Sequence, residues 1–114
     1  MMDELLQEAI KAVIPRCHCP VAPPDTQTPY VIWQRFGGDA PDYLDNEDPQ
    51  VATAEVQLRI FSDDVLEPKL LMPQLLSALR AHPDLVIRPI GSFRDDYDHD
   101  MDLYSADQDI HVSY

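Results

Sequence analysis

Residues 52–61 read Ala-Thr-Ala-Glu-Val-Gln-Leu-Arg-Ile-Phe, an alternation of apolar and polar side chains that runs to Ile60. Because successive side chains of a strand point to opposite faces, this segment has one apolar and one polar face. The sequence therefore predicts a strand over residues 52–61, packed on its apolar face against other apolar elements, most simply two helices. The apolar face holds Ala54, Val56, Leu58 and Ile60, and the polar face holds Glu55, Gln57 and Arg59.

The preceding run, residues 30–36, reads Tyr-Val-Ile-Trp-Gln-Arg-Phe and predicts a second strand, because β-branched and aromatic residues favour strands. Between the two runs, residues 37–50 contain five acidic residues and neither Lys nor Arg. A hairpin normally closes with about two to five residues, and longer loops without secondary structure are usually functional or disordered. We interpret residues 37–50 as an acidic arm outside the core, typical of a protein that works by contact rather than by chemistry.

The N-terminal segment, residues 3–14, has apolar residues at helical spacing and predicts a first helix. Asp3 is expected to be its N-cap, and Pro15 is expected to end it. Four prolines between residues 20 and 29 argue against a helix there, so we expect a short strand around residues 16–21 followed by an extended connection.

A second helix is predicted within residues 62–81, where leucines and a methionine form an apolar stripe. Asp64 and Glu67 have capping-box spacing, and Pro68 suits the first turn. Pro73 lies inside the stripe, so we expect either a kink or a helix that begins near that point.

The C-terminal third predicts two more strands. Residues 85–93 form the first, with Pro89 marking an edge strand or a bulge, and residues 95–102 are expected to be a polar connection. The last strand begins near residues 103–105 and alternates over residues 108–114. The sequence therefore predicts one α+β domain over residues 1–114, with a single, mostly antiparallel sheet of four to five strands and two helices on one face.

The net charge of −13 is concentrated in two segments. Residues 37–50 hold five acidic residues, residues 95–109 hold seven, and neither segment contains Lys or Arg. The remaining nine acidic residues nearly balance all eight basic ones. Blocks of like charge indicate solvated or interaction surfaces, and without a basic footprint we expect no grip on nucleic-acid phosphates. The twelve acidic residues are Asp39, Asp42, Asp45, Glu47, Asp48, Asp95, Asp96, Asp98, Asp100, Asp102, Asp107 and Asp109.

Candidate metal sites are incomplete in this sequence. Cys17 and Cys19 flank His18, but a zinc site needs a second ligand pair, and we expect both thiols to share one strand face in the reduced state. Residues 96–107 have the length of a calcium loop, yet Met101 stands where that loop requires Gly, and the last position is Asp rather than Glu. We therefore expect no metal, and interpret the acidic segment as a solvated turn.

The sequence likewise lacks the familiar motifs for catalysis and for membrane insertion. The sequence has no nucleophile elbow, phosphate-binding glycine loop or zinc-protease motif, so we expect no enzyme activity and no cofactor. It shows no apolar run of about 20 residues and no signal-peptide pattern, so we expect no membrane partner and a cytoplasmic location.

The residues expected to contact partners lie in the second strand and the acidic arm. Trp, Arg and Phe are enriched at interfaces, although Trp33 has the alternative of being an ordinary core residue. Arg35 leads into two glycines at the base of the arm, which favours exposure. The full expected set is Trp33, Arg35, Phe36, Asp39, Asp42, Tyr43, Asp45, Glu47 and Asp48.

The combination of these features resembles the small tail-completion proteins of long-tailed bacteriophages and prophages, also called tail terminators or head–tail joining proteins. The resemblance rests on Pro29-Tyr30-Val31 with a following aromatic and Gln34-Arg35, then the acidic loop and the alternating strand over residues 54–61, a helix, and a closing strand that ends in an aromatic. It covers roughly residues 3–114. Pro68 and Pro73 depart from the smooth helix of such proteins, and the 95–102 connection is longer than usual.

The resemblance implies a hexameric ring that caps the tail tube, stops polymerisation of the tube protein, and offers a face to the head connector while DNA passes through its hole. It also implies assembly in the host cytoplasm and residence in the virion tail. A channel for DNA should repel phosphates, so at least one acidic segment is expected to face the lumen or a tube-facing rim. Besides residues 37–50, the residues expected to face the lumen are Asp95, Asp96, Asp98, Asp100 and Asp102. The alternative hypothesis is an acidic DNA mimic that inhibits a host DNA-binding protein.

Overall fold

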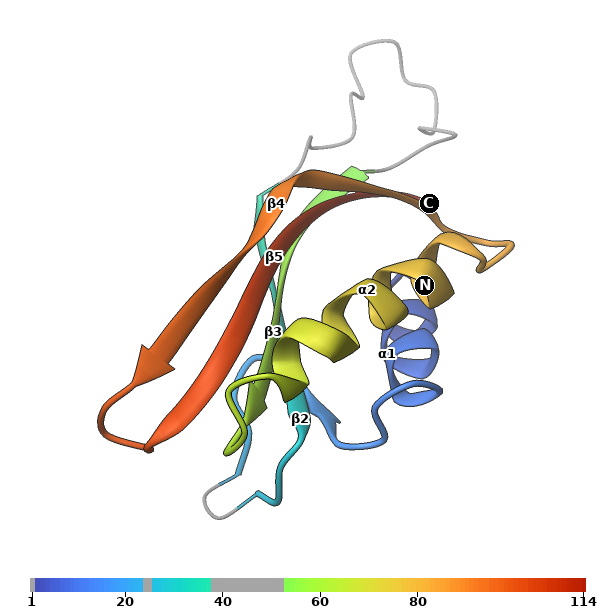
Figure 1. The fold of residues 1–114 in the computed structure, drawn as a ribbon. Helices are drawn as coiled ribbons and strands as arrows, with labels where there is room; N and C mark the ends of the chain where they lie inside the picture. The colour runs from blue at the N-terminus through green and yellow to red at the C-terminus, as the bar shows by residue number, and fades with distance from the viewer. Residues whose placement is uncertain (1, 24–25, 38–52) are drawn as a thin grey trace, which may run out of the picture.

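The computed structural model describes residues 2–23, 26–37 and 53–114, which form two helices and a five-stranded sheet (Figure 1). The sheet order is β1-β2-β3-β5-β4; the β1–β2 pair is parallel and the other three described pairs are antiparallel. Both helices lie on the same side of the sheet (Figure 1), which confirms the predicted α+β class. In chain order the elements are α1 (Met2–Lys11), β1 (Cys17–His18), β2 (Tyr30–Gly37), β3 (Thr53–Ser62), α2 (Glu67–Arg80), β4 (Val86–Asp98) and β5 (Leu103–Ser113).

The centre of the sheet is β3, the strand predicted from the alternating segment. Ala54, Val56, Leu58 and Ile60 point toward the helices and are fully buried, while Glu55, Gln57 and Arg59 lie on the other side and are partly exposed. We call these two sides the helix face and the open face. The core joins the helix face of the sheet to Leu6 and Ile10 of α1 and to the buried stripe of α2. At about 25 cal/mol per Å² of buried apolar surface, this layer is the main favourable contribution to folding.

The first helix differs from its prediction at both ends. It begins at Met2 and ends at Lys11, so Asp3 lies in the first turn and is not the N-cap. At that position its carboxylate favours the positive end of the helix dipole. The helix ends four residues before Pro15, in a turn where the Ile14 N–H donates to the Ile10 carbonyl at 2.9 Å.

The second helix begins without the predicted capping box. Its N-cap residue is Leu66, which makes no side-chain cap bond. Ser62 Oγ donates to Glu67 Oε1 at 2.6 Å, and Asp64 Oδ1 accepts from the Leu66 N–H at 2.9 Å, so the two acidic side chains act separately. Pro68 lies in the first turn as predicted.

The helix α2 continues through Pro73 without interruption, so a start near that residue is wrong. Pro73 is exposed, and its missing N–H cannot donate to the carbonyl four residues earlier. Neither helix in the described part of the chain is long and apolar enough to span a membrane.

The C-terminal strands form a long hairpin at one edge of the sheet. The predicted edge position and bulge of the strand around Pro89 are confirmed, because β4 is the outermost strand and its register shifts between Ile90 and Arg94. The predicted polar connection over residues 95–102 is wrong in its first half: Asp95 to Asp98 continue β4 and pair with β5. This pairing carries the hairpin beyond the start of α2 (Figure 1).

Candidate assembly surfaces

Trp33 lies in the core, the alternative that the sequence left open. Its side chain is buried on the helix face, and Nε1 donates to Gln7 Oε1 on α1. Gln7 in turn donates through Nε2 to the Cys17 carbonyl at 2.9 Å. Trp33 therefore joins β2, α1 and β1, and it offers little surface to a partner.

Arg35 and Phe36 are exposed at the end of β2. Arg35 Nη2 forms an ion pair with Asp3 Oδ1 on α1 at 2.8 Å, with both side chains about half exposed. Phe36 lies at the register shift between Arg35 and Gly37, and the residue is 51% exposed. An exposed aromatic ring at a strand end is typical of a contact residue. The remaining residues expected at this interface, Asp39, Asp42, Tyr43, Asp45, Glu47 and Asp48, lie outside the described residues.

The two cysteines are separated by the structure. Cys17 is buried in β1 on the helix face, whereas Cys19 follows the strand and is exposed, so the expectation that they share one face is wrong. Burial raises the pKa of the Cys17 thiol to about 12. The Cys17 Sγ donates to Gln7 Oε1 at 3.4 Å, so this thiol belongs to the Trp33 network.

The acidic tip of the β4–β5 hairpin is organised by its own side chains. Asp98 Oδ1 accepts from the N–H groups of Asp100 and Met101 at 2.9 and 3.0 Å, the pattern of an Asx turn. Asp102 has φ 54°, a left-handed conformation that Asp tolerates. It accepts a hydrogen bond from the Tyr97 hydroxyl, which raises the pKa of Tyr97. These carboxylates thus close the turn, and in the described part of the chain no three acidic, His or Cys side chains gather as metal ligands.

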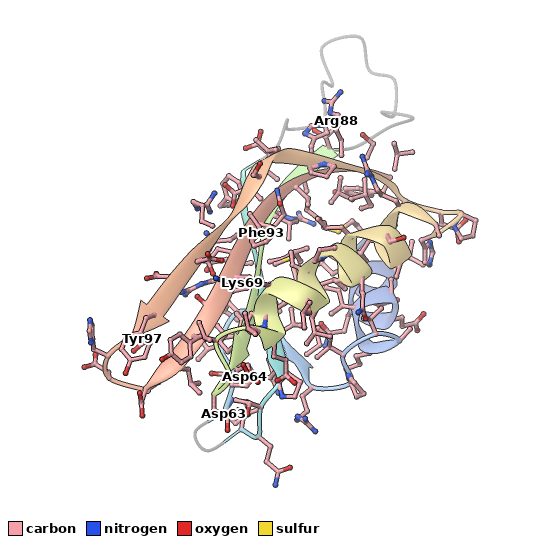
Figure 2. All side chains as sticks on the ribbon, viewed as in Figure 1. Asp63, Asp64, Lys69, Arg88, Phe93 and Tyr97 are labelled. Atoms are coloured by element: carbon pink, nitrogen blue, oxygen red, sulfur yellow. The ribbon has the colours of Figure 1, made fainter. Side chains whose placement is uncertain are left out.

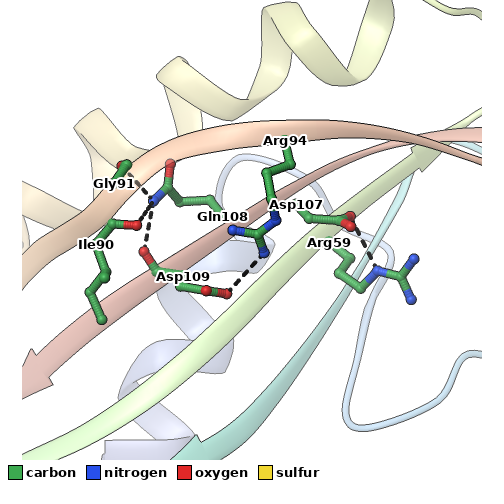
Figure 3. Close-up of polar contacts among 7 residues, drawn as sticks. All are labelled: Arg59, Ile90, Gly91, Arg94, Asp107, Gln108 and Asp109. Atoms are coloured by element: carbon green, nitrogen blue, oxygen red, sulfur yellow. Dashed lines mark hydrogen bonds and ion pairs between the residues drawn. The ribbon is translucent and has the colours of Figure 1, made fainter.

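Three other carboxylates of the 95–109 segment are paired with basic residues from neighbouring elements. The sequence predicted a bare acidic block, but basic side chains of β3, β4 and α2 reach into it (Figure 3 shows the first two pairs). Such partly exposed pairs contribute little stability each, yet they lower the local negative charge. The pairs are Arg59 Nε–Asp107 Oδ1 at 3.2 Å, Arg94 Nη2–Asp109 Oδ1 at 3.3 Å, and Lys69 Nζ–Asp95 Oδ2 at 3.3 Å.

Gln108 is a buried polar residue that the sequence analysis did not single out. Its Nε2 donates to the carbonyls of Ile90 at 3.3 Å, Gly91 at 3.1 Å and Asp109 at 2.7 Å (Figure 3). These bonds hold the β4 bulge, where Gly91 has φ +70° and the ladder is interrupted. The available signal was a glutamine at a position where the alternation of β5 requires an apolar side chain.

Two hollows lie at the hairpin end of the sheet. One, of about 520 Å³, is on the open face beside the stacked rings of Tyr30 and Phe61, whose centroids are 5.1 Å apart. The other, of about 370 Å³, lies between the start of α2 and the hairpin, and we call it the α2–hairpin groove. It is lined by Val65, Lys69, Asp95, Asp96, Tyr97, Tyr104 and Ser105.

Comparison with known proteins adds one finding to this geometry. The model of a protein family described as "Tail completion protein gp17" matches residues 4–114, which is nearly the whole chain. No curated protein matches the chain.

Proposed function

The chain belongs to the tail completion protein gp17 family, a family of structural phage proteins, and on that premise we propose that it is a tail terminator. In this role it forms a hexameric ring that ends polymerisation of the tail-tube protein and joins the tail to the head connector. It assembles in the host cytoplasm and remains in the virion tail. The match of the family model to residues 4–114 is the observation that carries the proposal.

Exposed apolar side chains on β2 and on the edge strand β4 support ring formation. Phe36 is 51% exposed on β2, and Val86 and Ile90 are 69% and 41% exposed on the edge strand β4. A ring of identical subunits needs two different surfaces that meet head to tail and close. Two separate strands of this sheet provide different exposed sets, Arg35 and Phe36 on β2 and Val86 and Ile90 on β4.

The acidic hairpin supports passage of DNA without binding. We propose that the carboxylates of this hairpin face the central hole or the rim toward the tube, where negative charge repels phosphates and lets the duplex slide. Asp100 contributes most freely, because Asp98 and Asp102 also hold the turn and Asp95 is paired with Lys69. The proposed set remains Asp95, Asp96, Asp98, Asp100 and Asp102, with the 37–50 arm as the competing lining.

The proposal is tested with the tail-tube protein of the same phage or prophage. Tubes polymerised without the chain should grow to variable length, and addition of a small amount of the chain should stop growth early. Electron micrographs should then show a ring at one tube end. Tubes of unchanged length without a terminal ring would show that the chain is not a terminator.

The rival hypothesis of a DNA mimic has less support from the geometry. A mimic needs one contiguous negative face, but in the described residues the register places Asp95 on the helix face and Asp96 on the open face. Asp107 and Asp109 are paired with arginines. Inhibition of a host DNA-binding protein by the monomeric chain would favour the mimic over the terminator.

A further inference from the structure

The solvent side of α2 carries apolar side chains that no described element covers. Leu66 and Leu70 lie about one helical turn apart and are 59% and 65% exposed. Pro73 continues the same line and is exposed as well. A surface helix normally turns its apolar residues to the core and its polar ones to solvent. The buried residues of α2 already join the core, so Leu66, Leu70 and Pro73 form a second apolar surface on this helix.

The same line of side chains ends in polar and basic residues. Ser77 and Arg80 follow Pro73 at steps of four and three residues, and both are exposed. Steps of three and four residues keep side chains on one side of a helix. We call Leu66, Leu70, Pro73, Ser77 and Arg80 the outer stripe of α2. It runs for roughly 21 Å at about 1.5 Å per residue.

Opposite charges stand at the two ends of the outer stripe. Asp63 and Asp64 are exposed just before the helix (Figure 2), and Arg80 is the last residue of the helix. In the described part of the chain, neither Asp63 nor Arg80 forms an ion pair. Lys69 lies outside the stripe and pairs with Asp95 of the hairpin. The stripe therefore has an acidic, apolar end and a basic, polar end.

The spacing of these residues is the same when it is read in either direction. Counted along the chain, they form pairs that lie equally far from the middle of α2, between residues 71 and 72. The pairs are Asp63 with Arg80, Leu66 with Ser77, and Leu70 with Pro73. Two copies of α2 that pack antiparallel therefore bring the members of each pair together, once on either side of a two-fold axis.

We propose that the outer stripe of α2 packs antiparallel against the outer stripe of a second copy of this chain. Leu70 then lies against the partner subunit's Pro73, and Asp63 faces the partner subunit's Arg80. The second copy is the occupant because the surface is complementary to itself in charge. A parallel pair of helices would instead place acid beside acid and base beside base, and like charges across an interface disfavour such a pairing.

This contact goes beyond the proposed terminator function and does not rest on it. A ring needs two different surfaces that meet head to tail, whereas a contact between identical surfaces closes at two subunits. The outer stripe therefore forms a dimer of the free protein and leaves the surfaces of β2 and β4 to the ring.

The test uses two charge reversals, D63R and R80E, each on an exposed side chain. Each variant alone places like charges at both ends of the contact, which should raise the dissociation constant of the dimer by about tenfold or more. Light scattering from about 0.01 to 1 mM measures it, in low salt because salt screens exposed charges. An equimolar mixture of the two variants should dimerise again, and native mass spectrometry should detect the heterodimer, because both ends of that pair join opposite charges.

The matched controls are E8R and K11E, which reverse exposed charges of each sign on α1, outside the outer stripe. Both should dimerise like the wild type. Wild-type protein that stays monomeric up to about 1 mM would overturn the inference. A mixture of D63R and R80E that stays monomeric while the wild type dimerises would overturn it as well.

The variant L70E separates this inference from the terminator proposal. Leu70 is exposed, so the variant should fold, which far-ultraviolet circular dichroism checks. L70E should stay monomeric and still stop tube growth, because the ring uses other surfaces. Dimers that persist in L70E, or loss of its effect on tube growth when the wild type stops growth, would overturn the inference. A wild-type chain that dimerises but does not stop tube growth would remove the terminator proposal alone.

Discussion

Gln108 shows how one polar side chain determines the path of an edge strand. Replacing it with Met keeps the volume but removes the three bonds to Ile90, Gly91 and Asp109. We expect the Q108M variant to lose about 1–2 kcal/mol in free energy of unfolding, because the carbonyls at the bulge lose a buried donor. Urea denaturation measures the loss.

The control for this prediction is Q34M, at an exposed position of β2, which should stay within about 0.5 kcal/mol of the wild type. Equal stability of Q108M and the wild type would mean that the bulge does not depend on the glutamine.

The cysteines allow a second prediction about single residues. Cys19 is exposed, whereas Cys17 is buried and the pKa of its thiol is raised to about 12. Because the thiolate is the reactive form, a maleimide at pH 8 should modify Cys19 in the folded protein and both thiols only after denaturation. Mass spectrometry of the intact chain counts the labels, and the variant C19S should remain unlabelled when folded. Labelling of folded C19S would show that the β1 region opens readily.

The raised pKa of Cys17 also gives a pH dependence of stability. The thiol has a pKa of 9.0 in its ordinary environment and about 12 in the fold. Its contribution to the free energy of unfolding is therefore complete below about pH 9 and is lost as the pH rises toward 12. A C17A variant should lose less stability than the wild type between pH 8 and pH 10, measured by urea denaturation at both values. Parallel losses in the two proteins would contradict this assignment.

Among the elements, α2 contains a proline in its interior. Pro73 is exposed, and proline is about 3 kcal/mol less favourable than alanine inside a helix. We expect P73A to raise the free energy of unfolding by about 1 kcal/mol, less than the full difference because the surrounding helix has adapted to the ring. Thermal unfolding measures the gain, and P68A in the first turn is the control without an expected gain. A destabilised P73A variant would show that the ring packs against something essential.

How well each element was predicted depended on whether burial and local preference agreed. The alternation over residues 52–61 predicted β3 because its apolar face is the face that the helices cover. The end of β4 was missed because Asp has a low strand preference, and pairing with β5 overrides that preference. The predicted capping box of Asp64 and Glu67 was wrong, because the Glu67 carboxylate accepts a hydrogen bond from Ser62 Oγ instead.

For the candidate assembly surfaces, sequence reasoning found exposed Arg35 and Phe36 but missed the exposed apolar side chains of β4 and the α2–hairpin groove. The exposure of Val86 and Ile90 follows from the edge position of β4 and the register of its pairing. The α2–hairpin groove brings residues 65 and 69 of the helix beside residues 95–97 and 104–105 of the hairpin. Proximity of this kind depends on the tertiary fold, and no local pattern in the sequence encodes it.

At the scale of the whole molecule, stability should decline from the central strands toward the hairpin tip. β3 and β5 lie inside the sheet and pack against α2, whereas residues 94–102 are largely exposed and extend past the start of α2. Hydrogen exchange of the free protein should therefore be slowest in β3 and the middle of β5 and fastest at the tip, because exposed hydrogen bonds open locally. Exchange at the hairpin tip as slow as in β3 would contradict this order.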